Sequence, residues 1–160
     1  MIGSGERGIE RLYLDTSVFG GYFDAEFEIW TKILFDKIIE GTYKVIYSQL
    51  TDAELSPAPM QVRNLISTLP EISKEFISTS DEAAYLADQY ITENVVGKTS
   101  RTDCTHIALA TLHDADILVS WNFKHIVNVN RIRGYNAVNS KLGHKILEIR
   151  TPREILEYED

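Results

Sequence analysis

Short apolar runs alternate with longer segments of helical periodicity along almost the whole chain, and this alternation constrains the fold more than any other feature. Such an order is typical of α/β proteins, in which a mostly parallel sheet carries helices on both faces. The segments that we expect to form strands are 12–14, 45–47, 76–78, 117–120 and 146–149.

Helices are predicted from apolar spacing and from residues that favour a helix start or end. Asp24 is expected to start a helix that ends at Gly41, and Ser56 with Pro57 is expected to start another. Further helical segments are expected at 51–55, 81–95, about 100–113, 131–142 and from 152 onward.

The 160 residues suit a single domain, 1–160, with its core at about 11–150. Hydrophobic residues make up 44% of the chain and charged residues 25%, which is enough apolar material for a core. No apolar run approaches the roughly 20 residues that cross a membrane, and the polar segment 1–10 has no signal-peptide character. With Cys104 as the one cysteine, no internal disulfide can form, and a cytoplasmic location is expected.

The net charge of −8 argues, taken alone, against a nucleic-acid partner. The charges are unevenly distributed, however. Residues 1–96 hold 7 basic and 16 acidic residues, whereas 97–153 hold 9 basic and 4 acidic ones. One face could therefore bind a nucleic acid, although an ordinary solvated surface explains these counts equally well.

Acidic and amide side chains fall where predicted strands end. Asp15 follows the first strand, Glu54 lies just beyond the second, and Asn122 lies just beyond 117–120. Asp103 opens the helix that leads into 117–120. Ligands of open α/β sheets bind beyond the carboxyl ends of the strands, so these side chains meet there if the first strand is central. Oxygen ligands suit Mg²⁺ or Mn²⁺, and phosphodiester hydrolysis is a natural chemistry for such a site.

Each acidic residue also has an interpretation without function. Asp15, Thr16 and Ser17 could form a polar turn after the strand. Asp103 could be a charge favoured by the helix dipole, and Glu54 could be a solvated helical residue. The specificity therefore lies in the set and not in any one member.

Four segments carry a wider resemblance: LYLDTSV at 12–18, SQLTDAEL at 48–55, DCTHIALA at 103–110 and ILVSWNF at 117–123. In this order and approximate spacing they resemble the PIN domain, a family that includes the toxins of VapBC-type toxin–antitoxin pairs. The similarity spans about residues 11–149.

The resemblance implies an α/β/α sandwich and a ribonuclease that depends on Mg²⁺ or Mn²⁺, often as a homodimer and with an antitoxin protein as partner. It carries over Asp15, Glu54 and Asp103 as metal-binding acids, with a metal-activated water as the nucleophile. Thr16 or Ser17 would hydrogen-bond to these metal ligands and so orient them. For Ser17, a plain hydrogen bond at the strand end is the preferred interpretation.

The sequence departs from the family pattern at the fourth position, where Asn122 replaces the usual Asp. This leaves open a PIN-like module that binds RNA or a partner with weak or no nuclease activity. Asp52 is a second choice for the role of Glu54. A phosphatase with Asp15 as nucleophile is disfavoured, because Ser17 stands where such enzymes need a second Asp.

Basic residues near two of these motifs are candidates for binding the RNA backbone, although each could equally be an ordinary surface charge. They are Arg101, Lys124 and Arg131, with Lys98, His125 and Arg133 nearby. His106 could act as a general base, but a packed histidine with a satisfied hydrogen bond is preferred. Trp30 and Trp121 are assigned to the core or an interface in preference to base stacking, and Cys104 is assigned to the core.

Overall fold

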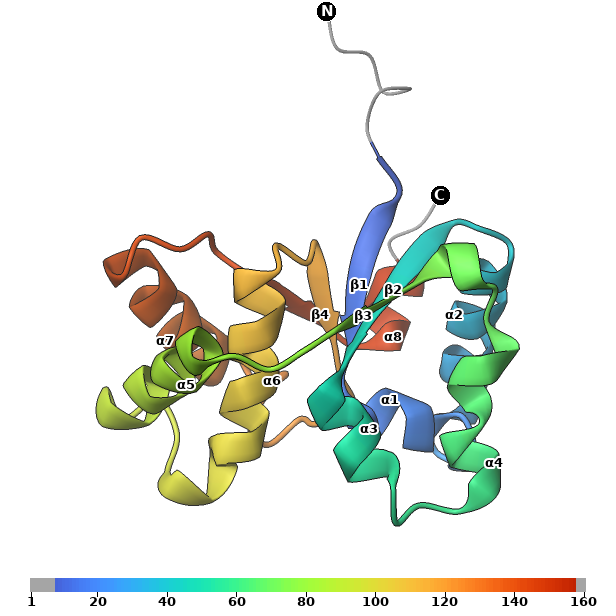
Figure 1. Ribbon diagram of the computed structural model, residues 1–160, viewed down its shortest axis with the longest axis horizontal. Helices are drawn as coiled ribbons and strands as arrows, with labels where there is room; N and C mark the ends of the chain where they lie inside the picture. The colour runs from blue at the N-terminus through green and yellow to red at the C-terminus, as the bar shows by residue number, and fades with distance from the viewer. Residues whose placement is uncertain (1–7, 158–160) are drawn as a thin grey trace, which may run out of the picture.

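Five strands form one parallel sheet in the computed structural model, which describes residues 8–157 (Figure 1). They are β1 (Glu10–Leu14), β2 (Tyr43–Ser48), β3 (Lys74–Ile77), β4 (Ile117–Val119) and β5 (Glu148–Arg150). Their order is β3-β2-β1-β4-β5, and every neighbouring pair is parallel. Strand β1 is therefore central, between β2 and β4, which is the condition under which the side chains at the strand ends can meet.

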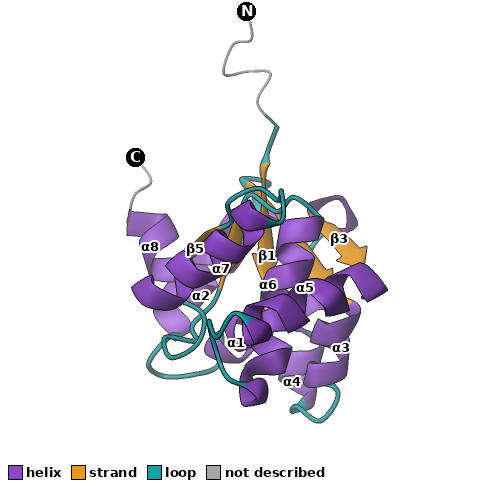
Figure 2. Cartoon of the chain, turned by 90° about the vertical axis from the view of Figure 1, so that its left-hand side faces the viewer, coloured by secondary structure: helices purple, strands orange, loops and turns teal. Residues whose placement is uncertain are grey.

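Helices cover both faces of the sheet, so the predicted three-layer α/β/α arrangement is confirmed (Figure 1). One face carries α5 (Asp81–Thr92), α6 (Arg101–Leu112) and α7 (Val129–Lys141), which stand in front of the strands in Figure 2. The other face carries α1 (Thr16–Gly21), α2 (Glu28–Ile39), α4 (Met60–Arg63) and α8 (Pro152–Glu157). Helix α3 (Gln49–Leu55) follows β2 directly, and three short 3-10 turns lie at Leu65–Thr68, Glu71–Ser73 and Lys98–Ser100.

The sheet separates two apolar cores because successive side chains of a strand point to opposite faces. In β1, Tyr13 packs into the core under α5, α6 and α7, whereas Leu12 and Leu14 pack into the core under α1, α2 and α8. In β4, Leu118 and Val119 divide in the same way. Strands buried on both faces are apolar throughout, which explains why their sequences read as continuous hydrophobic runs.

The segment after Asp15, for which a polar turn was the alternative to a functional role, forms α1, in which Val18 and Phe19 are buried. Two local predictions were wrong. Helix α2 begins at Glu28, because the Asp24 carboxylate accepts the backbone N–H of Glu26 in a preceding turn. The helix predicted from Ser56 begins only at Met60, after Pro59.

The ends of the chain, residues 1–7 and 158–160, lie outside the described residues, so the predictions for the polar N-terminal segment and for the full 1–160 domain remain predictions. Within 8–157, no helix is long and apolar enough to cross a bilayer.

Candidate active site

Asp15 lies at the carboxyl end of β1, where the extended backbone turns into α1. Its side chain is only 4% exposed, and both carboxylate oxygens accept hydroxyl hydrogen bonds. The Ser17 Oγ donates to Oδ1 over 2.6 Å, and the Ser120 Oγ donates to Oδ2 over 2.7 Å. Burial raises the pKa of Asp15, and the charge of Asp103 raises it further, while His106 and the two hydroxyls oppose this shift.

The same two serines fasten β1 to the loop after β4. The backbone N–H of Trp121 donates to the Ser17 Oγ over 2.9 Å, and that of Asn122 donates to the Ser120 Oγ over 2.9 Å. Each hydroxyl therefore accepts from this loop and donates to Asp15. The position of the carboxylate is consequently fixed relative to both strand ends.

Glu54 reaches the site from α3. Its Oε1 accepts from the Thr16 Oγ1 over 2.5 Å and lies 2.5 Å from the His106 Nε2. Partial burial alone would raise the pKa of Glu54, but the hydrogen bonds from His106 and Thr16 outweigh it and lower the pKa below its usual value. Glu54 is therefore ionised at neutral pH.

His106 is the link between Glu54 and the interior. Its Nδ1 lies 2.7 Å from the Tyr13 hydroxyl, which lies 2.8 Å from the Ser48 Oγ. Both ring nitrogens of His106 are therefore engaged, Nε2 by Glu54 and Nδ1 by Tyr13. The expectation of a packed histidine with a satisfied hydrogen bond is confirmed, but its partner, Glu54, was not foreseen.

Asp103 lies in the first turn of α6 and is half-buried. The Asn122 Nδ2 donates to its Oδ1 over 3.4 Å, whereas the Asn122 Oδ1 accepts the backbone N–H groups of Lys124 and His125. Burial raises the pKa of Asp103, as does the charge of Glu54, while His125 and His106 lower it. Asn122 thus turns its amide nitrogen, and not its oxygen, toward the acids.

His125 borders this cluster as well. Its Nδ1 is buried and has no hydrogen-bond partner among residues 8–157. Two histidines therefore stand beside the carboxylates, His106 fully bonded and His125 with one ring nitrogen unsatisfied.

The side chains of this site fit the divalent cation that the resemblance implies only in part. Burial is the main cause of the raised pKa values of Asp15 and Asp103, and a divalent cation would favour their ionised forms there, since carboxylate oxygens are the ligands that Mg²⁺ and Mn²⁺ prefer. In the conformation described for residues 8–157, however, no group of three or more His, Cys, Asp or Glu side chains is arranged to hold an ion. Asp15 and Asp103 fit such a cation chemically, while the Oε1 of Glu54 is engaged by His106 and Thr16.

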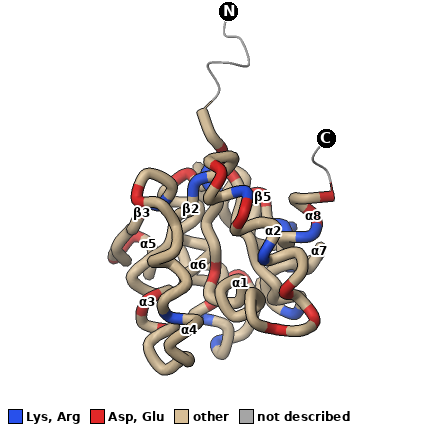
Figure 3. The backbone as a smooth tube through the Cα atoms, turned by 90° about the vertical axis from the view of Figure 1, so that its right-hand side faces the viewer, with Lys and Arg blue, Asp and Glu red and all other residues tan. Residues whose placement is uncertain are grey.

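The basic candidates have different partners. The guanidinium of Arg101 pairs with Asp88 of α5, and that of Arg131 donates to the Val95 carbonyl. Lys124 is exposed on the loop after β4. On the face that carries α2 and α8, acidic and basic segments lie side by side (Figure 3).

Sequence reasoning missed Ser120 and Tyr13. Ser120 directly follows β4, so the same strand-end argument that selected Asn122 could have found it. Tyr13 offered a weaker signal, namely a hydroxyl that stands between two leucines of a buried strand and needs a buried partner.

Neither a protein-family model nor a curated protein matches this chain. Solved structures do. VapBC2 from Rickettsia felis, bound to a DNA fragment from its promoter, has a TM-score of 0.53 at 16% identity, covering 88% of this chain and 98% of that one. FitAcB from Neisseria gonorrhoeae has a TM-score of 0.55 at 15% identity, covering 89% and 98%. FitAB bound to an IR36 DNA fragment has a TM-score of 0.57 at 13% identity, covering 88% and 94%. At these identities the likeness establishes a shared fold.

Proposed function

We propose that the protein is a PIN-type ribonuclease that depends on Mg²⁺ or Mn²⁺ and hydrolyses RNA phosphodiester bonds. The observation that carries the proposal is the convergence of Asp15, Glu54, Asp103 and Asn122, from four separate parts of the chain, beyond the carboxyl ends of β1 and β4. Two of these residues, Asp15 and Asp103, are acids whose pKa values are raised by burial, and such acids suit a site that receives a cation.

In this mechanism the chain itself supplies binding and orientation. Asp15 and Asp103 would hold the ion, with Ser17 and Ser120 fixing the orientation of the Asp15 carboxylate. Glu54, kept ionised by His106, adds negative charge beside them. When bound, the ion supplies Lewis-acid activation of water and of the phosphate.

A role as the toxin of a toxin–antitoxin pair extends this proposal. It is supported by the fold shared with VapBC2 and FitAB and by the PIN resemblance of the four sequence motifs. The proposed partners are an antitoxin protein and a second copy of this chain. Co-expression with the product of an adjacent short reading frame, followed by light scattering of the purified complex, tests both.

Cleavage of a labelled single-stranded RNA tests the ribonuclease itself. We expect cleavage with Mn²⁺ or Mg²⁺, poor cleavage with Zn²⁺, none in EDTA, and a strong loss in Asp15→Asn and Asp103→Asn. Asp36→Asn, which removes an exposed acid from α2, serves as the matched control and should cleave normally. Full activity in EDTA, or normal cleavage by both site variants, would refute the proposal.

One observation favours a second candidate, a PIN-like module that binds RNA or a partner without cleaving it. Asn122 brings no charge to the fourth position, and its carbonyl oxygen is bonded to the following loop. A module of this kind would bind RNA equally well with and without EDTA and would show no cleavage with any ion.

A further inference from the structure

A pocket of about 550 Å³ lies beyond the carboxyl ends of β4 and β5, next to the acidic cluster. Trp121, Phe123 and Val127 lie in the segment after β4, and Thr151 follows β5. The turn before α2, α2 itself and α8 supply the remaining walls. Its volume is within the range of small-ligand sites. Its lining includes Phe27, Trp30, Trp121, Phe123, Arg153 and Glu154.

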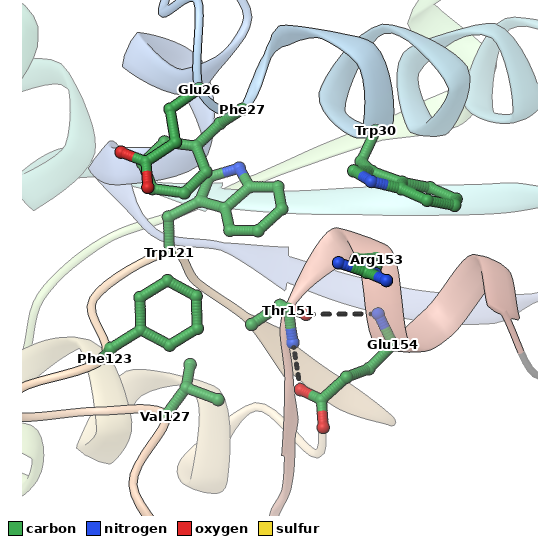
Figure 4. Close-up of a pocket in the computed structure, with 9 residues that line it drawn as sticks. All are labelled: Glu26, Phe27, Trp30, Trp121, Phe123, Val127, Thr151, Arg153 and Glu154. Atoms are coloured by element: carbon green, nitrogen blue, oxygen red, sulfur yellow. Dashed lines mark hydrogen bonds between the residues drawn. The ribbon is translucent and has the colours of Figure 1, made fainter.

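The walls of the pocket are flat and largely aromatic (Figure 4). Phe27 stacks on Trp121 with ring centroids 4.4 Å apart and planes 21° apart, and Phe123 lies 6.2 Å from both rings. On the other side, the Arg153 guanidinium lies 5.5 Å from the centre of the Trp30 ring. Planar π surfaces of this kind are what proteins use to stack unpaired nucleobases.

The aromatic wall is held in place before any ligand arrives. The Trp121 Nε1 donates to the Thr31 Oγ1 over 2.9 Å, which fixes the indole against α2. By contrast, Phe123 is 52% exposed at the mouth of the pocket. Trp121 is only 7% exposed, so Phe123 supplies the solvent-accessible ring of this wall and Trp121 the fixed ring behind it.

The charges of the pocket favour a neutral ring over a phosphate. Two carboxylates, Glu26 and Glu154, line it beside a single guanidinium, that of Arg153. Glu154 is already engaged, because its Oε1 accepts the backbone N–H of Thr151 over 2.9 Å. The net negative surface of the pocket would repel an anionic ligand, whereas it would not repel an uncharged base.

Trp121 joins this pocket to the acids directly. It stands between Ser120, which donates to Asp15, and Asn122, which donates to Asp103. Its own backbone N–H donates to Ser17. A nucleotide whose phosphate lay at the acids would therefore place a neighbouring base within reach of the aromatic wall.

We propose that this pocket binds a nucleobase of the single-stranded RNA whose phosphate is cleaved at the acidic cluster, an inference that rests on the proposed ribonuclease function. The base lies between the Trp121–Phe123 wall and the Trp30–Arg153 wall. The pocket thereby selects unpaired RNA, because a base in a duplex cannot enter it.

Tryptophan fluorescence reports selectively on ligand binding in this pocket, since both tryptophans of the chain line it. In the Asp15→Asn background with Mn²⁺, a short single-stranded RNA should quench the emission, and an equimolar duplex should not. Phe123→Ala should weaken RNA binding roughly 5- to 150-fold, the range measured for the loss of one base–aromatic stack. Phe123→Tyr keeps the ring and should restore binding.

Phe76→Ala is the matched control, because Phe76 is 48% exposed on the edge strand β3, away from the pocket. It should bind RNA as the Asp15→Asn parent does. In the cleavage-competent protein, Phe123→Ala should raise KM while kcat stays close to its original value.

The outcomes separate the two proposals. If RNA is cleaved but Phe123→Ala and Phe76→Ala share one KM and RNA causes no quenching, the pocket proposal is overturned and the ribonuclease stands. If RNA quenches the emission and Phe123→Ala weakens binding but no ion supports cleavage, the pocket stands and the ribonuclease fails. Quenching by a co-purified partner protein, with none by RNA, would overturn the nucleobase assignment in favour of a protein occupant.

Discussion

At the scale of single residues, the site contains two carboxyl groups, those of Asp15 and Asp103, whose ionised forms are unfavourable where they lie. Asp15 is buried with only neutral hydroxyl donors on its two oxygens, and Asp103 adds a second negative charge to its surroundings. Hydrogen bonds from serines orient a carboxylate but do not neutralise it. The folded protein without a cation therefore carries a destabilising charge that its geometry keeps in place.

The first prediction follows from the raised pKa of Asp15. Between the unfolded pKa of about 3.9 and the raised folded value, the folded state binds more protons, so stability falls as pH rises through that window. Asp15→Asn removes the charge and should give a Tm at pH 7, without metal, equal to or above that of the original protein. Below about pH 4 this advantage should vanish. Thermal melts from pH 3.5 to 8 check it, and a variant that loses more stability at pH 7 than at pH 4 would contradict it.

Asn122→Asp carries the second prediction. The substitution replaces an amide donor to Asp103 with another carboxylate, so Tm in EDTA should fall at pH 7. Charge on the ligands strengthens binding of a hard cation, so Mn²⁺ should raise the Tm of the variant more than that of the original protein. Calorimetric titration with Mn²⁺ measures the same effect directly. Unchanged Mn²⁺ affinity would show that position 122 does not take part in cation binding.

At the scale of elements, the site depends on contacts between α1, α3, α6 and the loop after β4. Strand-end positions such as Asp15 and Asn122 could be predicted, because the carboxyl ends of parallel strands share one edge. The contact between His106 and Glu54 could not be predicted, because it depends on how α6 and α3, which are distant in the chain, are placed relative to each other. The helical state of 16–21 was also hidden, since it is stabilised by burial and not by local preference.

Helix α1 provides the third prediction, through its two adjacent glycines. A Cβ at Gly21 would lie 2.7 Å from the Trp121 Cδ1, whereas a Cβ at Gly20 meets no atom within 4 Å. Gly21→Ala should therefore cost about 1–3 kcal/mol of unfolding free energy and shift the tryptophan emission. Gly20→Ala, the control, should leave the emission unchanged and add up to about 1 kcal/mol. Urea denaturation compares the two, and equal effects would show that α1 does not press on the indole.

At the scale of the whole molecule, two cores enclose the sheet, and Cys104 marks the interior of one of them. Its side chain is 0% exposed in the core under α5, α6 and α7, and burial raises the pKa of its thiol to about 12. The sequence correctly assigned this residue to the core. As the one cysteine of the chain, it offers a probe of global opening.

The fourth prediction concerns this thiol. A disulfide reagent at pH 8 should modify native Cys104 only when the molecule unfolds, because reaction requires an exposed thiolate. The labelling rate should rise with urea in proportion to the unfolded fraction measured by circular dichroism. Ligands that stabilise the fold, such as Mn²⁺, should slow it. Rapid labelling in native buffer would contradict the burial of this core.

The central position of β1 also sets an order of events during synthesis. Asp15 and Ser120, which share a hydrogen bond across β1 and β4, are 105 residues apart in the chain. At 5–20 residues per second a ribosome needs about 5–20 seconds to make the intervening segment. During that time one edge of β1 has no partner strand and Asp15 lacks its second hydroxyl. The proposed ribonuclease would thus be unable to cleave its own messenger until most of the fold had emerged, while its unpaired strand edge would be open to a chaperone or to another chain.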